Sequence, residues 1–263
     1  MDLDLTGRTA LVTGGSLGLG RAMAAAFHGA GANVALVARR EAILVEAKAA
    51  IEDEQGGSGA KVGVYPCDVT DASMIENAFA AATADLGDID ILVNNAGQSQ
   101  TGRFEELTDD IWQADLDLKL FAAIRFSRLV FPGMKERGWG RIINILNTAA
   151  KAPPPGSAPT SVSRAAGMAL TKVLAGEGAP HNILVNALMI GSIKSDQVRR
   201  AYDRSDKSVS FEDFTIASGR SLPMGRMGEA EECGNVALFL ASNAASYLTG
   251  CAINMDGGLS RVV

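Results

Sequence analysis

The sequence has little of the chemistry that metal sites, disulfide scaffolds and histidine-based active sites require. Its 263 residues include only three cysteines and two histidines. The cysteines, Cys67, Cys233 and Cys251, are odd in number, widely separated and without the spacing of metal ligands. We therefore expect small reduced thiols in the core, and the sequence gives no indication of a zinc site.

Concentrated positive charge and long apolar runs are also scarce. The formal net charge is −6, and lysine and arginine are scattered, so no basic stripe could neutralise a nucleic-acid backbone. Polar residues interrupt each apolar stretch before it reaches a membrane-spanning length, and residues 1–4 lack the character of a signal peptide. We expect a cytoplasmic protein that binds a small-molecule substrate and neither nucleic acid nor membrane.

What the sequence does contain is an alternation of short β-branched runs with longer Ala-rich segments of helical period. This alternation is typical of βα units that wind a parallel sheet. The predicted strands are Arg8–Thr13, Asn33–Ala38, Lys61–Cys67, Ile89–Asn94, Arg141–Asn147, Ile183–Leu188 and Ala252–Asp256. The predicted helices are Leu19–Gly29, Glu41–Glu54, Ala72–Leu86, Asp109–Arg137, Thr160–Glu177 and Glu229–Ser242. These elements fill the chain, so we expect one α/β domain over residues 1–263.

One segment departs from the alternation. Residues 191–222 are polar and charged, and their large apolar side chains are scattered: Tyr202, Phe211, Phe214 and Ile216. Long insertions in compact domains tend to be functional. We therefore expect a substrate lid over residues 191–222.

A glycine-rich turn follows the first predicted strand directly. The run from Thr13 to Gly20 reads T-G-G-S-L-G-L-G, and a helix opens after it. Glycines permit a tight turn and a close backbone approach, while the free N–H groups of the helix N-terminus face a pyrophosphate. The strand-turn-helix context predicts a dinucleotide-binding turn that involves Gly14, Ser16, Leu17, Gly18 and Leu19.

The T-G-x-x-x-G-x-G spacing resembles that of the short-chain dehydrogenase/reductase family, in particular its 3-oxoacyl-ACP-reductase-like members. Further motifs appear in the family's order: Asp68-Val69, Asn94-Asn95-Ala96-Gly97, Asn186-Ala187, Gly225-Arg226-Met227-Gly228, Leu240-Ala241-Ser242, Thr249-Gly250 and Asp256-Gly257-Gly258. The resemblance implies a three-layer Rossmann fold, with a doubly wound seven-stranded parallel sheet of order 3-2-1-4-5-6-7 and helices on both faces. It also implies an oxidoreductase and a homo-tetramer or dimer.

By the same resemblance, Asp68 and Val69 contact the adenine, while Asn95, Ala96 and Gly97 line the side of the adenine ribose. A purely structural role for Asn95, in tying neighbouring strands together, is an equal alternative. Arg164 and Ile193 complete the set of cofactor contacts that the resemblance implies.

The charge after the second strand indicates which dinucleotide binds. An NAD-selective site needs a carboxylate there, whereas a 2′-phosphate needs a cation. Here Ala38 occupies the place of that carboxylate and Arg39 follows it, with a guanidinium that suits a phosphate. We therefore expect a preference for NADP(H), with NAD(H) possible. The alternative is that Arg39 and Arg40 are two solvated arginines at the start of a helix.

The catalytic positions depart from the family. Its tetrad consists of Asn, Ser, Tyr and Lys, and the aligned positions here carry Lys119, Asn147, Thr160 and Arg164. A threonine hydroxyl is shorter and far less acidic than a phenol, so ordinary proton transfer by Thr160 is not expected. Arg164 could still bond the ribose, and Asn147 could donate to a carbonyl.

Other groups are candidates for the missing acid. Tyr202 is the one plausible phenol, although a packing role in the lid is the favoured interpretation. Lys119 and Lys151 are alternative donors, because a desolvated lysine beside another cation titrates near neutrality. We also expect Lys119, Lys151 and Arg164 to converge on the substrate and to favour an anion. The lid arginines Arg199, Arg200 and Arg204 would lie above them or pair with nearby acids.

Three functions fit these observations. The first is an NADP(H)-dependent oxidoreductase that acts on a carbonyl or alcohol with a rearranged proton donor. The second is a nucleotide-binding regulatory protein that has lost the chemistry. The third is a reaction without hydride transfer on the same scaffold. The fold cannot choose among them, because function depends on the site.

Overall fold

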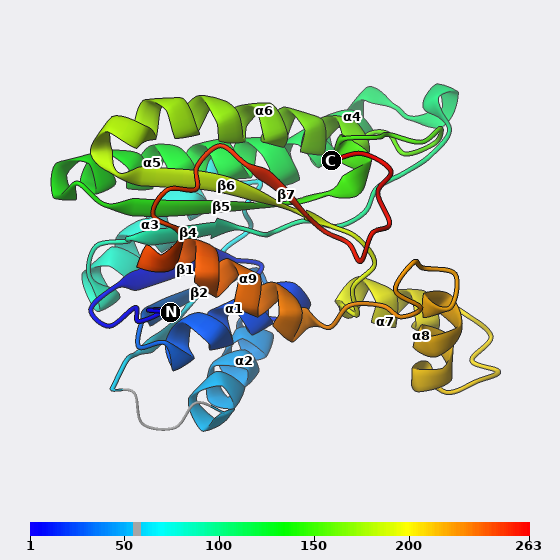
Figure 1. Ribbon diagram of the computed structural model, residues 1–263, viewed down its shortest axis with the longest axis horizontal. Coiled ribbons are helices and arrows are strands. Elements are labelled where there is room, and N and C mark those ends of the chain that lie inside the picture. The colour runs from blue at the N-terminus through cyan, green and yellow to red at the C-terminus, as the bar shows by residue number, and fades with distance from the viewer. Residues whose placement is uncertain (55–58) are drawn as a thin grey trace.

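A parallel sheet forms the middle layer of the protein (Figure 1). The structure is a computed structural model that describes residues 1–54 and 59–263. Within these residues the sheet has seven strands in the order β3-β2-β1-β4-β5-β6-β7, which confirms the predicted Rossmann topology. The strands are β1 (Thr9–Thr13), β2 (Asn33–Ala38), β3 (Val62–Pro66), β4 (Ile91–Asn94), β5 (Gly140–Asn147), β6 (Ile183–Ile190) and β7 (Ala252–Met255).

Helices cover both faces of this sheet (Figure 1). One layer contains α1 (Gly18–Gly29), α2 (Glu41–Glu54) and α9 (Ala230–Ala241). The other contains α3 (Ala72–Leu86), α4 (Asp109–Leu116), α5 (Ala122–Arg137) and α6 (Thr160–Gly178). The remaining helices, α7 (Asp196–Asp203) and α8 (Phe211–Gly219), project from one end of the molecule.

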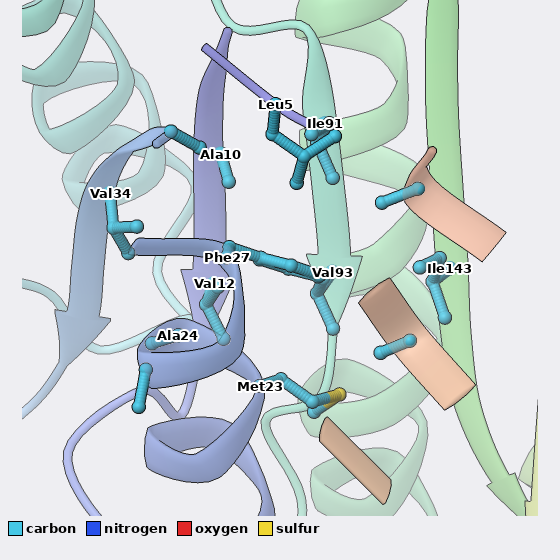
Figure 2. Close-up of a cluster of buried hydrophobic side chains, with 14 of the residues drawn as sticks. Leu5, Ala10, Val12, Met23, Ala24, Phe27, Val34, Ile91, Val93 and Ile143 are labelled. Atoms are coloured by element: carbon cyan, nitrogen blue, oxygen red, sulfur yellow. The ribbon is translucent and has the colours of Figure 1, made fainter. Parts of the chain in front are cut away.

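The core between α1 and the sheet shows why these residues form these layers. Figure 2 shows Phe27 of α1 directed between Val12 of β1 and Val93 of β4, and all three side chains are fully buried. The preceding residue of β1, Leu11, packs into the cluster on the opposite face. All five residues of β1 are buried, and its central run Ala10–Val12 is apolar, as expected for a strand covered on both faces.

The long helix predicted over Asp109–Arg137 is divided. A π-helical turn over Asp117–Phe121 separates α4 from α5. The apolar period continues through the turn, so the sequence carries no signal for it. π-helical turns inside helices are often found at functional sites, and this one contains Lys119.

The segment 191–222 forms a helical hairpin that is held at its base. The backbone N–H of Lys194 donates to the Gly228 carbonyl at 2.8 Å, and that of Gly228 donates to the Ser192 carbonyl at 2.9 Å. Within the hairpin, the ring of Tyr202 contacts those of Phe211 and Phe214, with centroids 5.4 and 5.6 Å apart. The role of the hairpin as a substrate lid stays a prediction.

The cysteines, possible metal-binding clusters and possible membrane-spanning helices can be inspected in the structure. All three cysteines are free thiols, and two of them are buried. Among the described residues no cluster of His, Cys, Asp or Glu is arranged to hold a metal ion. In the same residues no helix combines the length and the apolar character that crossing a membrane requires.

Candidate active site

A cavity of about 660 Å³ opens at the carboxyl ends of the strands. Sheet order reverses between β1 and β4, and ligands of doubly wound folds bind at such a switch point. The lining contains most of the predicted site residues: Gly14, Ser16, Leu17, Gly18, Leu19, Arg39, Asp68, Val69, Asn95, Ala96, Gly97, Asn147, Thr160, Arg164 and Ile193. Lys119 lies behind Thr160, outside this lining.

The glycine-rich turn is a backbone cradle. Gly14 has a φ of +64°, which favours glycine, and a Cβ on Gly20 would lie 2.1 Å from the Gly14 carbonyl oxygen. Leu17 is the N-cap of α1, and its side chain accepts no capping hydrogen bond. The first N–H groups of α1 therefore remain free for an anion. The cradle fits the diphosphate of a dinucleotide.

Two polar side chains secure the switch point. The Thr13 hydroxyl donates to the Val93 carbonyl at 3.2 Å and accepts from the N–H groups of Asn95 and Ala96 at 2.9 and 3.0 Å. The Asn95 amide donates to the carbonyls of Thr13 and Gly14 at 2.9 and 3.2 Å. Asn95 thus performs the structural role that the sequence left as an alternative.

Thr160 is the centre of a hydrogen-bond network at the reaction end of the cavity. Its hydroxyl accepts from Lys119 Nζ at 2.6 Å and from the Gln100 N–H at 2.9 Å. The same hydroxyl donates to the Gln100 carbonyl at 2.7 Å. A side chain that lines the cavity is therefore hydrogen bonded directly to a buried cation.

The buried ammonium of Lys119 is paired with a buried carboxylate. Both Lys119 and Asp115 have side chains that are 1% exposed, and they form an ion pair and a hydrogen bond. The other Asp115 oxygen accepts from Ser163 Oγ at 2.6 Å. Burial lowers the pKa of Lys119 to about 8, and this effect outweighs the opposing one of Asp115. Lys119 therefore exchanges its proton closer to neutrality than an ordinary lysine does.

Arg164 is the cation on the cavity wall. Its Nη1 donates to the Ile145 carbonyl at 2.6 Å, and a Cβ on Gly97 would lie 2.5 Å from its Nη2. Burial lowers the pKa of Arg164 to about 10, so it is a cation at neutral pH. Asn147, at the end of β5, has a buried Oδ1 without a hydrogen-bond partner within the described part of the chain.

Two of the proposed surrogate acids lie elsewhere. Lys151 Nζ donates to the Ala252 carbonyl at 2.7 Å and to Asn254 Oδ1 at 2.6 Å. The expectation that it converges with Lys119 and Arg164 was wrong, because β7 offers Lys151 two acceptors. The Tyr202 hydroxyl donates to the Val209 carbonyl at 3.0 Å, in agreement with a packing role.

The lid arginines differ in their surroundings. Arg200 lines the cavity and pairs with Asp196 at 2.5 Å. The guanidinium carbon of Arg199 lies 3.7 Å from the centroid of the Phe211 ring, so Arg199 stacks within the hairpin. Arg204 is exposed.

Sequence reasoning missed three residues of this site. Asp115 and Gln100 hold Lys119 and Thr160, and Asp196 reaches the cavity from α7 beside the expected Arg200. The spacing of four residues between Asp115 and Lys119 was a usable signal for an ion pair on a helix. The backbone contacts of Gln100 carry no such signal.

The glycine cradle at the switch point of a parallel sheet defines the class: the protein is a Rossmann-type dinucleotide-binding protein. A sequence profile described as enoyl-(acyl carrier protein) reductase matches residues 14–260. The acetoacetyl-CoA reductase of Rhizobium meliloti is 35% identical over 253 residues, which cover 95% of this chain and 98% of the relative. The chain belongs to the short-chain dehydrogenase/reductase family of oxidoreductases.

Solved structures extend this similarity. The L-sorbose reductase of Gluconobacter frateurii, complexed with NADPH and L-sorbose, is 31% identical with a TM-score of 0.91, and the match covers 100% of both chains. An NADPH-bound short-chain oxidoreductase from Pseudomonas aeruginosa, described as containing an atypical catalytic center, is 36% identical with a TM-score of 0.90. That match covers 99% of each chain. Both complexes agree with the predicted NADP(H) preference.

Proposed function

We propose that the protein is an NADPH-dependent reductase of carbonyl compounds with a rearranged proton donor. The observation that carries this proposal is the hydrogen bond of Thr160, on the cavity wall, to the buried Lys119. The relative from Pseudomonas aeruginosa supports it, since that protein binds NADPH and is described as having an atypical catalytic center.

The cofactor end has the groups that NADPH needs. The cradle around Gly14 and the free N–H groups of α1 would hold the diphosphate, and the exposed Arg39 would pair with the 2′-phosphate. Asp68 and Val69 would contact the adenine, and Arg164 the nicotinamide ribose. When bound, NADPH supplies the hydride for the carbonyl carbon.

The proton would come from Lys119 through Thr160. The Thr160 hydroxyl, which donates to the Gln100 carbonyl in the structure, would rotate and give its proton to the carbonyl oxygen of the substrate. Lys119 Nζ would then donate a proton to Thr160 and restore the hydroxyl. The lysine is left neutral, and a pKa of about 8 makes its deprotonation accessible near neutral pH. Asp115 keeps Lys119 in place through the transfer.

The charge of the site favours an anionic substrate. Lys119 and Arg164 carry two positive charges and Asp115 one negative charge, so this buried group has an excess of one positive charge. A carboxylate or phosphate on the substrate would balance it. The side-chain N–H of Asn147, which lines the cavity, would donate to the carbonyl and orient it. The homo-tetramer and the cytoplasmic location stay predictions.

The test is NADPH oxidation by the purified protein with a panel of ketones and aldehydes, each offered with and without a carboxylate. Wild type should turn over at least one carboxylated carbonyl. Thr160→Val keeps the shape of the side chain but removes the hydroxyl, and it should lower kcat by a hundredfold or more, on the order of the contribution of general acid catalysis. Lys119→Met should lower kcat similarly.

Binding and chemistry are separated by calorimetry on the same variants. Both variants should bind NADPH as tightly as wild type does, because neither changes the cradle. If wild type binds NADPH but oxidises it with no carbonyl, the protein is a nucleotide-binding protein without this activity. If Thr160→Val retains full turnover, the proton follows another route.

A further inference from the structure

The hairpin begins against the glycine cradle. A Cβ on Gly18 would lie 3.3 Å from the Asp196 nitrogen and 3.7 Å from Ser195 Cβ, so the first turn of α7 touches the turn that precedes α1. Asp196 and Arg200 both line the cavity. Arg200 Nη2 lies 2.5 Å from Asp196 Oδ2, one helical turn away.

This arrangement puts the Asp196 carboxylate on the wall of the cavity into which the cradle opens. The cradle around Gly18 is an anion site, and Asp196 beside it would repel an anion unless a cation stood between them. Long helical side chains point back toward the helix N-terminus, so the Arg200 guanidinium is held at the cradle end of α7. Its side chain is 54% exposed, so the pair with Asp196 is solvated and easily exchanged.

We propose that Arg200 is a ligand of the cofactor diphosphate and that Asp196 holds its guanidinium ready beside the cradle. The inference rests on the proposed binding of NADP(H). A guanidinium has enough donors to serve a carboxylate and a phosphate at once, so Arg200 links α7 to the bound dinucleotide. The hairpin is thereby secured by the cofactor.

The experiment measures the Kd of NADPH and of NADH by calorimetry for wild type and five variants. Arg200→Gln should weaken both cofactors equally, by about tenfold or more, as expected for a charge-assisted hydrogen bond. Asp196→Asn removes both the repulsion and the ion pair that positions Arg200, so it should change the affinity for both cofactors by the same factor. Arg39→Ala should weaken NADPH and leave NADH unchanged, which separates the diphosphate from the 2′-phosphate. Arg204→Gln, at an exposed position just after α7, controls for the loss of one charge and should change neither Kd.

The double variant Asp196→Asn/Arg200→Gln decides between two roles of Arg200. If Arg200 contacts the diphosphate, the double variant binds both cofactors more weakly than Asp196→Asn alone. Equal affinities of these two variants would mean that Arg200 merely neutralises Asp196 and would overturn the proposal. An Arg200→Gln protein with wild-type affinity would overturn it as well and leave the proposed function intact. Failure of wild type to bind either cofactor would overturn both.

Discussion

The two ends of the cavity are built from different materials. The nucleotide end consists of backbone: the turn around Gly14 and Gly20 and the first N–H groups of α1. The reaction end consists of side chains, namely Lys119, Thr160 and Arg164, with long-range partners. A backbone site depends on conformation, whereas a side-chain site depends on residue identity. This difference explains how the glycine turn can keep the spacing expected for the family while substitutions are predicted at the four catalytic positions.

The reaction end is nevertheless a closed network. The Asp115 carboxylate balances the charge of the Lys119 ammonium. The carboxylate also accepts from the Ser163 hydroxyl, and the ammonium donates to the Thr160 hydroxyl. Buried charges without such partners are costly, so this network is organised for a cation at position 119. Lys119 and Thr160 therefore form one hydrogen-bonded unit with Asp115 and Ser163.

The largest effect on stability is expected when the reaction end loses Asp115, the counter-charge of Lys119. Asp115→Asn leaves Lys119 buried without its ion pair, and we expect the free energy of unfolding to fall by about 3–5 kcal/mol, as for other broken buried pairs. Urea denaturation measures it. The double variant Asp115→Leu/Lys119→Met, which removes both charges, should recover most of the loss. A single variant as stable as wild type would show that Lys119 is neutral or solvated in the fold.

The next largest effect is expected from a substitution in the glycine-rich turn of the nucleotide end. Gly20→Ala puts a Cβ 2.1 Å from the Gly14 carbonyl oxygen, so the cradle must open. We expect a loss of about 1–3 kcal/mol in stability from overpacking, together with NADPH binding too weak for calorimetry. In Gly176→Ala, on α6, the new Cβ meets no atom within 4 Å, and stability should change by about +1 kcal/mol or less. Normal NADPH affinity in Gly20→Ala would contradict the backbone account.

A smaller effect sharpens the comparison within the nucleotide end. Arg39→Ala removes the expected partner of the 2′-phosphate, and the affinity for NADPH should fall by about tenfold or more, the worth of a hydrogen bond to a charged group. The affinity for NADH should not change. Parallel titrations of Arg40→Ala, the neighbouring arginine on the cavity wall, identify which guanidinium is responsible. Equal losses for NADPH and NADH would remove the argument from charge.

The smallest effect is a pH dependence at the reaction end. The acid form of Lys119 is needed for carbonyl reduction, and burial lowers its pKa to about 8. The kcat for carbonyl reduction should therefore be highest below that pH and should decline as pH rises through about 8. The pH profile of kcat for wild type and for Lys119→Met checks this, because the residual activity of the variant should lack the limb near pH 8. The same limb in both proteins would assign it to another group.

Much of the fold follows from local patterns. The elements β2, α2 and α3 begin and end at the predicted residues. The reason is that strand and helix periods and cap residues are local properties of the sequence. The sheet order followed from the resemblance, and the glycine turn identified the switch point. For Tyr202, a packing role in the lid was the favoured interpretation, and the contacts of its ring with Phe211 and Phe214 agree with it.

Local sequence patterns were sufficient to predict the α/β alternation and the backbone cradle of the nucleotide end, whereas the alignment of Lys119, Asn147, Thr160 and Arg164 with the four catalytic positions stays a prediction from the resemblance. The tertiary structure decided the partners of their side chains. Lys119 bonds to Asp115 and Thr160, Lys151 bonds to acceptors of β7, and Arg200 pairs with Asp196. The physical reason is that a buried cation takes the acceptors that the fold brings within hydrogen-bond reach, and β7 lies about a hundred residues from Lys151 along the chain. Spacing in the sequence records only the near partners.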